Sequence, residues 1–260
     1  MPNANPLRDE LLSGDPVVEW ILPEFIPRGT LIALAGMPGA GKSYLCYYLG
    51  LAMAAGIKAL GFKPPRPQRV LYFDEENSPA DRIQYERWAW HGLQCPNLET
   101  LSKNFWPMPF RLGLPDWAER AHQLIEDNQP DLFIIDTSTP ACDIRDENDN
   151  AEASRVIRTI RHLMEASSPP ATALVLKHAK IHADDGSYSR RGAKAWMGQV
   201  DAIAYLRRHE GRPHSDGLNT TLLVPGKTRA FGLRRSLVIH PARTADGRGI
   251  HLAATSPRRP

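Results

Sequence analysis

Short, uniformly hydrophobic runs recur along most of the chain, separated by longer segments with polar and apolar positions mixed. The clearest runs cover residues 30–35, 69–74, 131–137 and 171–176, and residues 44–55 form an apolar segment of helical length. Strands without polar alternation are typical of a parallel sheet that is covered by helices on both faces. The pattern therefore predicts an α/β fold with a mostly parallel, twisted sheet flanked by helices.

Shorter apolar runs follow in the last third of the chain, broken by turn residues such as Pro225 and Gly226. They predict strands near residues 201–206, 220–224, 234–239 and 249–252, the last two of which we expect to form a small antiparallel C-terminal extension. The proline-rich segment 93–115 carries no predicted strand.

The order of these elements suggests one main domain. We expect a lead-in segment over residues 1–28, the domain itself over residues 29–240, and a terminal strand with a basic tail over residues 241–260. A chain of 260 residues with 42% hydrophobic positions is of ordinary size and composition for one large α/β domain.

Charge and cysteine content indicate which partners and which cellular compartment to expect. The net charge is only +3, so the whole molecule is not strongly basic, although arginines gather in the last third, where they form either a locally basic face or an ordinary solvated surface. Cys46, Cys95 and Cys142 lack paired or metal-binding spacing, which is typical of reduced thiols in the cytoplasm. The sequence has neither the pattern of a signal peptide nor an apolar run near the roughly 18 residues of a membrane span, so we expect no membrane contact.

The strongest chemical signal follows the first hydrophobic run. The motif G-x-x-x-x-G-K-[ST] is matched by Gly36, Met37, Pro38, Gly39, Ala40, Gly41, Lys42 and Ser43. In such a loop, glycines let backbone N–H groups surround the phosphates, the lysine reaches the β- and γ-phosphates, and the hydroxyl binds Mg²⁺. We therefore expect ATP and Mg²⁺ to bind here, with Tyr44 completing the nucleotide-binding stretch.

Acidic residues end two of the other predicted strands. Asp136 closes the run at 131–137 and is predicted to hold Mg²⁺ together with Ser43. Asp74, Glu75 and Glu76 end the run at 69–74, where they are either a solvated turn or site residues, and we expect one of them to act in catalysis, because ligands bind at the carboxyl ends of parallel strands. His178 ends a further strand, where it is either a site residue or a structural histidine.

This order of motifs resembles the RecA-type P-loop ATPase core, and most closely the plasmid RepA-type hexameric helicases, which are related to DnaB and KaiC. The resemblance covers roughly residues 15–240. It implies that Glu76 orients and deprotonates the attacking water and that His178 senses the γ-phosphate. It also implies a homo-oligomer, usually a hexamer, in which each site is completed by a neighbouring subunit.

The resemblance extends to residues that would act between subunits or on nucleic acid. Lys227 and Arg229 are similar to the K-x-R pair that enters a neighbour's site, although Arg207 or Arg208 could be that arginine finger instead. Single-stranded DNA is the expected further partner, through loops that face a central channel. The candidate contacts are Lys180, Arg190, Arg191 and Lys194.

The sequence thus predicts an ATP-hydrolysing motor, with a replicative-type DNA helicase of a plasmid, phage or mobile element as the leading hypothesis. One alternative is a regulatory or recombination-mediator ATPase that binds DNA or a partner without unwinding. Another is a scaffold whose assembly is controlled by nucleotide. A small-molecule kinase is disfavoured because no lid segment is evident.

Overall fold

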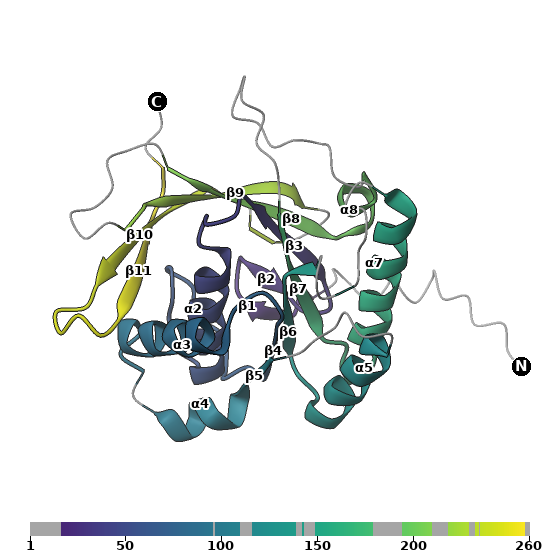
Figure 1. Ribbon diagram of the computed structural model, residues 1–260, viewed down its shortest axis with the longest axis horizontal. Coiled ribbons are helices and arrows are strands. Elements are labelled where there is room, and N and C mark those ends of the chain that lie inside the picture. Colours follow the sequence, from purple (N-terminus) through teal and green to yellow (C-terminus); the bar gives the residue numbers. More distant parts are fainter. Residues whose placement is uncertain are drawn as a thin grey trace, which may run out of the picture.

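Among the residues that the structure describes, nine strands form a mixed sheet at the centre of the protein (Figure 1). The structure is a computed structural model, and it describes residues 17–95, 97–109, 116–138, 142, 149–178, 194–209, 218–228, 232–233 and 235–257. The strands lie in the order β11-β10-β9-β8-β3-β7-β6-β4-β5, and β1 (Trp20–Leu22) pairs with β2 (Ile26–Pro27) in a separate antiparallel sheet.

The parallel part of the sheet contains the strands predicted from the hydrophobic runs and one strand that was not predicted. Its members are β3 (Leu31–Gly36), β4 (Val70–Asp74), β5 (Phe105–Pro109), β6 (Leu132–Asp136), β7 (Thr172–His178) and β8 (Ala202–Arg208). The antiparallel extension comprises β9 (Thr221–Thr228), β10 (Leu237–Arg243) and β11 (Ile250–Thr255). The predicted fold class is therefore confirmed.

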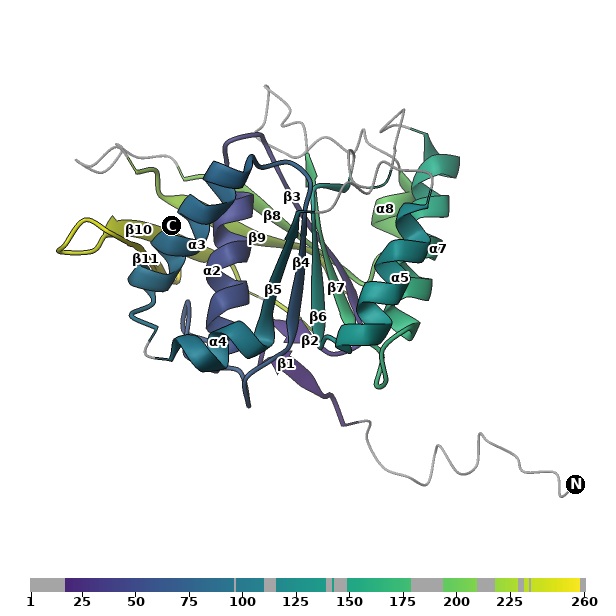
Figure 2. The same ribbon diagram turned by 60° about the horizontal axis from the view of Figure 1, so that its bottom comes forward.

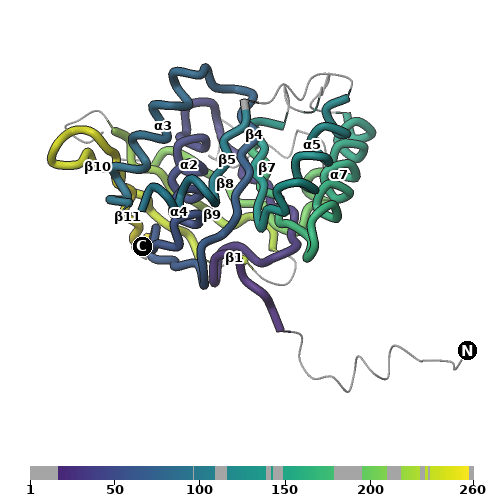
Figure 3. The backbone as a smooth tube through the Cα atoms, turned by 90° about the horizontal axis from the view of Figure 1, so that it is seen from below, coloured from purple at the N-terminus to yellow at the C-terminus, as the bar shows by residue number. Residues whose placement is uncertain are grey.

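Helices cover the sheet on two sides, as Figure 2 shows. On one face lie α2 (Lys42–Ala55), α3 (Pro79–Gly92) and α4 (Leu98–Asn104), and on the other lie α5 (Trp117–Asn128), α7 (Asn150–Glu165) and α8 (Lys194–Gln199). Ser78 and Asp149 cap α3 and α7 by accepting hydrogen bonds from backbone N–H groups of the first turn. Figure 3 shows β10 and β11 beside α2 and α3.

The two cores explain why the central strands have no polar alternation. Val70 and Tyr72 of β4 belong to the core beneath α2, whereas Leu71 and Phe73 belong to the core beneath α5 and α7. Every residue of these strands therefore faces a helix layer, and burial on both faces favours a continuous apolar run.

The segment 93–115, for which no strand was predicted, contains α4 and the edge strand β5. Two prolines in β5 obscure it in the sequence. A central strand donates N–H groups to neighbours on both sides, and proline has no N–H to donate. At an edge, one side of the strand needs no ladder partner, so Pro107 and Pro109 are tolerated there.

Candidate nucleotide-binding and hydrolysis site

The loop between β3 and α2 has the geometry of an anion cradle. Gly39 and Gly41 have φ angles of 72° and 87°, in the left-handed region that favours glycine. A side chain at Gly36 would overlap the carbonyl oxygen of Leu206 on β8, so only glycine fits the end of the strand. The first turn of α2 has neither a side-chain cap nor an acidic residue, so its positive end is left for a negatively charged ligand.

Lys42 holds its ammonium group inside this loop. The Nζ atom donates to the carbonyl oxygens of Gly36 and Met37, at 3.0 and 3.1 Å, and the residue is buried. Burial lowers the pKa of Lys42, while the nearby charges of Glu76 and Asp136 act in the opposite direction. The lysine is thus preorganised at the position where the motif requires a cation for the phosphates.

Asp136, at the end of β6, is a completely buried carboxylate. Its Oδ2 atom accepts a hydrogen bond of 2.8 Å from the Tyr72 hydroxyl, whereas Oδ1 is buried and accepts none within the described part of the chain. Burial raises the pKa of Asp136 to about 6, against the opposing effect of the Tyr72 and Ser43 hydroxyls. A buried acceptor without a partner, facing Ser43, fits the place of a Mg²⁺ ion or its bound water.

A second buried aspartate lies beside the first. Asp74 of β4 is paired in register with Asp136 of β6, and the side-chain nitrogen of Asn77 lies 3.0 Å from Asp74 Oδ1 and 3.4 Å from Asp136 Oδ2. The Tyr47 hydroxyl of α2 donates to Asp74 at 2.6 Å. These contacts hold the two strand ends and α2 in one rigid polar cluster beneath the loop.

Glu76 and His178 meet across the strand ends. The Nε2 atom of His178 lies 3.6 Å from the Glu76 carboxylate, and the backbone N–H groups of Glu75 and Glu76 donate to the Asp136 carbonyl oxygen. The closeness of His178 is the largest cause that lowers the pKa of Glu76, and it outweighs the effect of burial. Of the two adjacent glutamates, Glu76 is therefore the one held against the strand end where His178 lies, and it is ionised at neutral pH.

Lys227 lies elsewhere. Its ammonium donates to the carbonyl oxygens of Met197, Gly198 and Val200, at 2.7, 3.1 and 2.8 Å, and so binds the end of α8 in the same chain. Arg229, Lys180, Arg190 and Arg191 lie outside the described residues, as does the side chain of Lys194, whose backbone begins α8.

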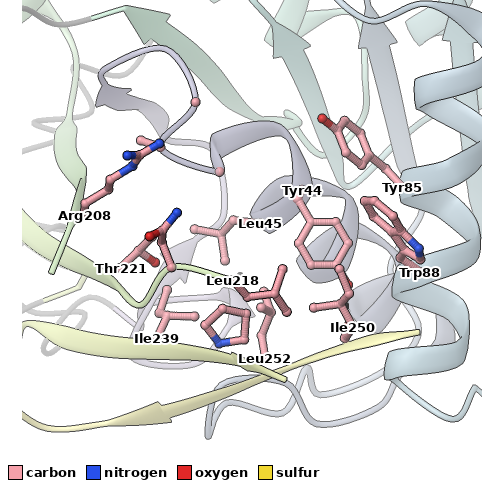
Figure 4. Close-up of a pocket in the computed structure, with 15 residues that line it drawn as sticks. Tyr44, Leu45, Tyr85, Trp88, Arg208, Leu218, Thr221, Ile239, Ile250 and Leu252 are labelled. Carbon is pink, nitrogen blue, oxygen red and sulfur yellow. Dashed lines mark hydrogen bonds between the residues drawn. The ribbon is translucent and has the colours of Figure 1, made fainter. Parts of the chain in front are cut away.

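A cavity of about 190 Å³ opens directly beside the phosphate loop (Figure 4). Gly39, Ala40 and Gly41 form one wall, and aromatic side chains from α2 and α3 form another. Strands of the antiparallel extension close the far side, and the Tyr44 hydroxyl donates to the Ile250 carbonyl there. The principal side chains around it are Tyr44, Tyr85, Trp88, Arg208, Leu218, Ile250 and Leu252. An apolar, aromatic cavity next to a phosphate cradle has the chemistry to hold a nucleobase.

Sequence reasoning missed several of these residues. Tyr47 and Tyr72 lie in apolar runs and give no sign that their hydroxyls reach aspartates. Asp74 was visible as a strand-end acid, but only the pairing of β4 with β6 brings it to Asp136. Tyr85 and Trp88 carry the one signal that could have been read, since aromatic residues one turn apart share a face of a helix.

Two features of the described residues bear on a bound metal and on a membrane span. No group of three or more His, Cys, Asp or Glu side chains there is arranged to hold a metal ion alone, which suits a Mg²⁺ that is bound by few protein ligands and by phosphates. No helix among those residues has the length and apolar character needed to traverse a membrane.

Comparison with known proteins agrees with this geometry. A protein-family model described as an AAA domain, AAA_25, matches residues 4–184, which include the phosphate loop, Glu76, Asp136 and His178. The structure is similar to the crystal structure of a KaiC-like protein from the hyperthermophilic archaeon Pyrococcus horikoshii, with a TM-score of 0.57 and 15% identity over 87% of this chain and 90% of that one. No curated protein matches significantly.

Proposed function

We propose, on the premise that the chain belongs to the AAA_25 family of RecA-like P-loop ATPases, that it is an ATP-hydrolysing motor and a hexameric replicative-type DNA helicase of a plasmid, phage or mobile element. The observation that carries hydrolysis is the meeting of Lys42, Asp136 and the Glu76–His178 pair at one edge of the sheet. A merely nucleotide-binding protein needs no such ionised base opposite the loop.

Each residue of the site has a proposed role in hydrolysis. The loop N–H groups and Lys42 bind the phosphates, while Ser43 and Asp136 would hold Mg²⁺, which supplies charge neutralisation when bound. Glu76 accepts a proton from the attacking water, because its lowered pKa keeps it ionised, and His178 holds it in place. The cluster of Asp74, Tyr47 and Tyr72 fixes these groups in position.

Assembly and nucleic-acid binding form the outer part of the proposal. Lys227 fixes α8 in its own chain, which leaves Arg229, two residues further on, as the proposed finger for a neighbouring site. A finger supplied in trans is worth about 10³–10⁵ in rate, so an isolated subunit should hydrolyse ATP very slowly. Lys180, Arg190, Arg191 and Lys194 are the proposed contacts to single-stranded DNA. The three free, buried cysteines suit a reducing cytoplasm.

The decisive experiment measures ATP hydrolysis with and without single-stranded DNA, together with mass by light scattering and strand displacement. We expect a hexameric mass, stimulation by DNA and unwinding. Lys42→Ala should lose nucleotide binding, whereas Glu76→Gln should keep binding and lose turnover by at least about 100-fold.

Each other result has a defined meaning. A monomer or dimer with turnover indifferent to DNA would refute the helicase and favour a regulatory ATPase. A change of mass on ATP without turnover would favour a nucleotide-controlled scaffold. Wild-type binding of ATP by Lys42→Ala would refute the nucleotide site itself.

A further inference from the structure

Arg208 leaves the sheet beside the phosphate loop of its own chain. β8 runs parallel to β3 with Leu206 opposite Gly36, so Arg208 projects from the strand end just beyond the start of the loop. A Cβ atom placed on Gly39 would lie 3.9 Å from the Arg208 Nη2 atom. Figure 4 shows the Arg208 side chain at the margin of the cavity, with its guanidinium toward the loop.

Strand alternation sets this direction. Ala204 and Leu206 of β8 belong to the core beneath α2, whereas Ile203 and Tyr205 pack on the opposite core. Successive side chains of a strand point to opposite faces, so Arg208 shares the face of Leu206 and of the phosphate loop. Its orientation therefore follows from the same pairing that builds the loop.

The surroundings of Arg208 call for a negatively charged ligand. Within the described part of the chain, its side chain has neither a hydrogen bond nor an ion pair. Its guanidinium lies beside Gly39 in the loop that leads into the positive end of α2, a place that repels a second cation unless an anion lies between them. Lys42 occupies the inside of the loop, against Gly36 and Met37, so the two cations approach the loop from different sides.

We propose that Arg208 binds the phosphate chain of the nucleotide in its own subunit, as a second cation beside Lys42, and is not the finger of a neighbouring site. This inference rests on the proposed function, because it assumes that a nucleoside triphosphate occupies the loop. A guanidinium offers five donors in a planar fork and binds phosphate oxygens through paired hydrogen bonds. Its closeness to the cavity makes stacking on the base the competing role.

The test is equilibrium binding of a fluorescent ATP analogue to the full chain. Arg208→Ala should weaken binding by about tenfold or more, the usual effect of losing a charge-assisted hydrogen bond. Arg248→Ala removes the same charge from an exposed turn between β10 and β11 and should bind like the wild type. Thermal melts of both variants check that the fold is retained.

Competition separates contact with phosphate from contact with the base. The inhibition constant of inorganic triphosphate, corrected for the weaker binding of the analogue, should be higher for Arg208→Ala than for the wild type, while the inhibition constant of adenosine should be the same for both proteins. The reverse pattern would overturn the proposal in favour of base stacking. Unchanged analogue binding by Arg208→Ala, with binding lost in Lys42→Ala, would overturn this inference alone. Wild-type binding by Lys42→Ala would show that the proposed function has failed.

Mixing variants tests whether the contact lies within one subunit. Preparations of Lys42→Ala and Arg208→Ala each lack one cation of the same site if Arg208 acts in its own subunit, so a mixture should hydrolyse ATP no faster than the sum of the two. Recovery of activity in the mixture would mean that an intact Arg208 had completed a neighbour's site, and would overturn the proposal.

Discussion

Asp136 and Asp74 form a pair of buried acids whose proposed role in ligand binding comes at the expense of stability. They face each other in register, and each accepts a hydrogen bond from a tyrosine hydroxyl, Tyr72 and Tyr47 respectively. Burial raises the pKa of Asp136 to about 6, and the nearby charge of Asp74 acts in the same direction. Without a cation, the ionised Asp136 is therefore less stable in the folded protein than in water.

Removing that charge should stabilise the free protein. The difference between a pKa of about 6 and the ordinary value of 3.8 corresponds to at most about 3 kcal/mol near neutral pH. We expect Asp136→Asn to raise the melting temperature at pH 7.5 in the absence of nucleotide and Mg²⁺, and to abolish ATP hydrolysis. The gain should shrink as the pH falls through 6, where the wild-type carboxyl becomes neutral. A lower melting temperature at pH 7.5 would contradict this account.

At the scale of elements, Asp131 at the start of β6 holds together the side of the sheet where the parallel strands begin, opposite to the candidate site. Arg28, between β2 and β3, and Arg66, before β4, both reach its carboxylate, with the closest contacts at 2.7 and 2.8 Å. The backbone N–H of Arg69 donates to it as well, at 2.8 Å. The Asp131 side chain thus joins two distant segments, one at residue 28 and one at residues 66–69, to the start of β6.

Neutralising Asp131 should destabilise the fold. In Asp131→Asn, the buried Arg28 guanidinium loses its buried acidic partner and keeps, among the described residues, the exposed Glu19, and we expect a loss of about 2–3 kcal/mol in the free energy of unfolding. Glu99→Gln removes an acid from the exposed pair with Lys103 and should change stability by less than about 0.5 kcal/mol. Urea denaturation measures both, and equal effects would refute the role of Asp131.

The same contact predicts a dependence on acid. Burial acts to raise the pKa of Asp131, but hydrogen bonds from Arg66, from the Arg69 backbone and from Arg28 outweigh it and lower the pKa below 3.8. A lowered carboxyl pKa gives stability that is present above the unfolded value and is lost as the pH falls through the folded value. Below about pH 4, the wild type should therefore lose stability more steeply than Asp131→Asn. Acid denaturation curves of equal steepness for the wild type and Asp131→Asn would contradict this expectation.

At the scale of the whole molecule, the C-terminal hairpin closes back onto the nucleotide side of the sheet. The last turn of α3 lies against the start of β11, where a side chain at Gly92 would overlap the carbonyl oxygen of Ile250. The Tyr48 hydroxyl and His251 are in contact at 3.0 Å in the same region. This packing forms the wall of the cavity beside the phosphate loop (Figures 1 and 4).

A methyl group at that contact should separate α3 from the hairpin. We expect Gly92→Ala to destabilise the protein by about 1–3 kcal/mol, because backbone atoms on both sides must move, and to weaken nucleotide binding through the distorted cavity. Gly198→Ala, in α8, meets open space and should be neutral or slightly stabilising. Thermal unfolding and nucleotide titration of the pair provide the measurement, and a Gly92→Ala variant as stable as Gly198→Ala would exclude this contact as important.

Local patterns in the sequence were enough to predict the phosphate loop, the buried parallel strands and the acids at their ends. Gly39, Gly41 and Lys42 act through backbone conformation and a neighbouring helix start, all within a few residues of one another. Burial on both faces requires apolar residues along a whole strand, so each strand could be recognised from its own residues. The fold class, and the position of Asp136 at a strand end, were therefore determined by the sequence.

Contacts between distant segments were decided only by the tertiary structure. The pairing of β4 with β6 brings Asp74 to Asp136, and the pairing of β8 with β3 brings Arg208 to the phosphate loop. Strand order depends on packing summed over the whole domain, and no local period encodes which strand lies beside which. For the same reason Pro107 and Pro109 hid β5, since a proline fits a strand where its missing N–H needs no ladder partner, and here the edge position of β5 provides that.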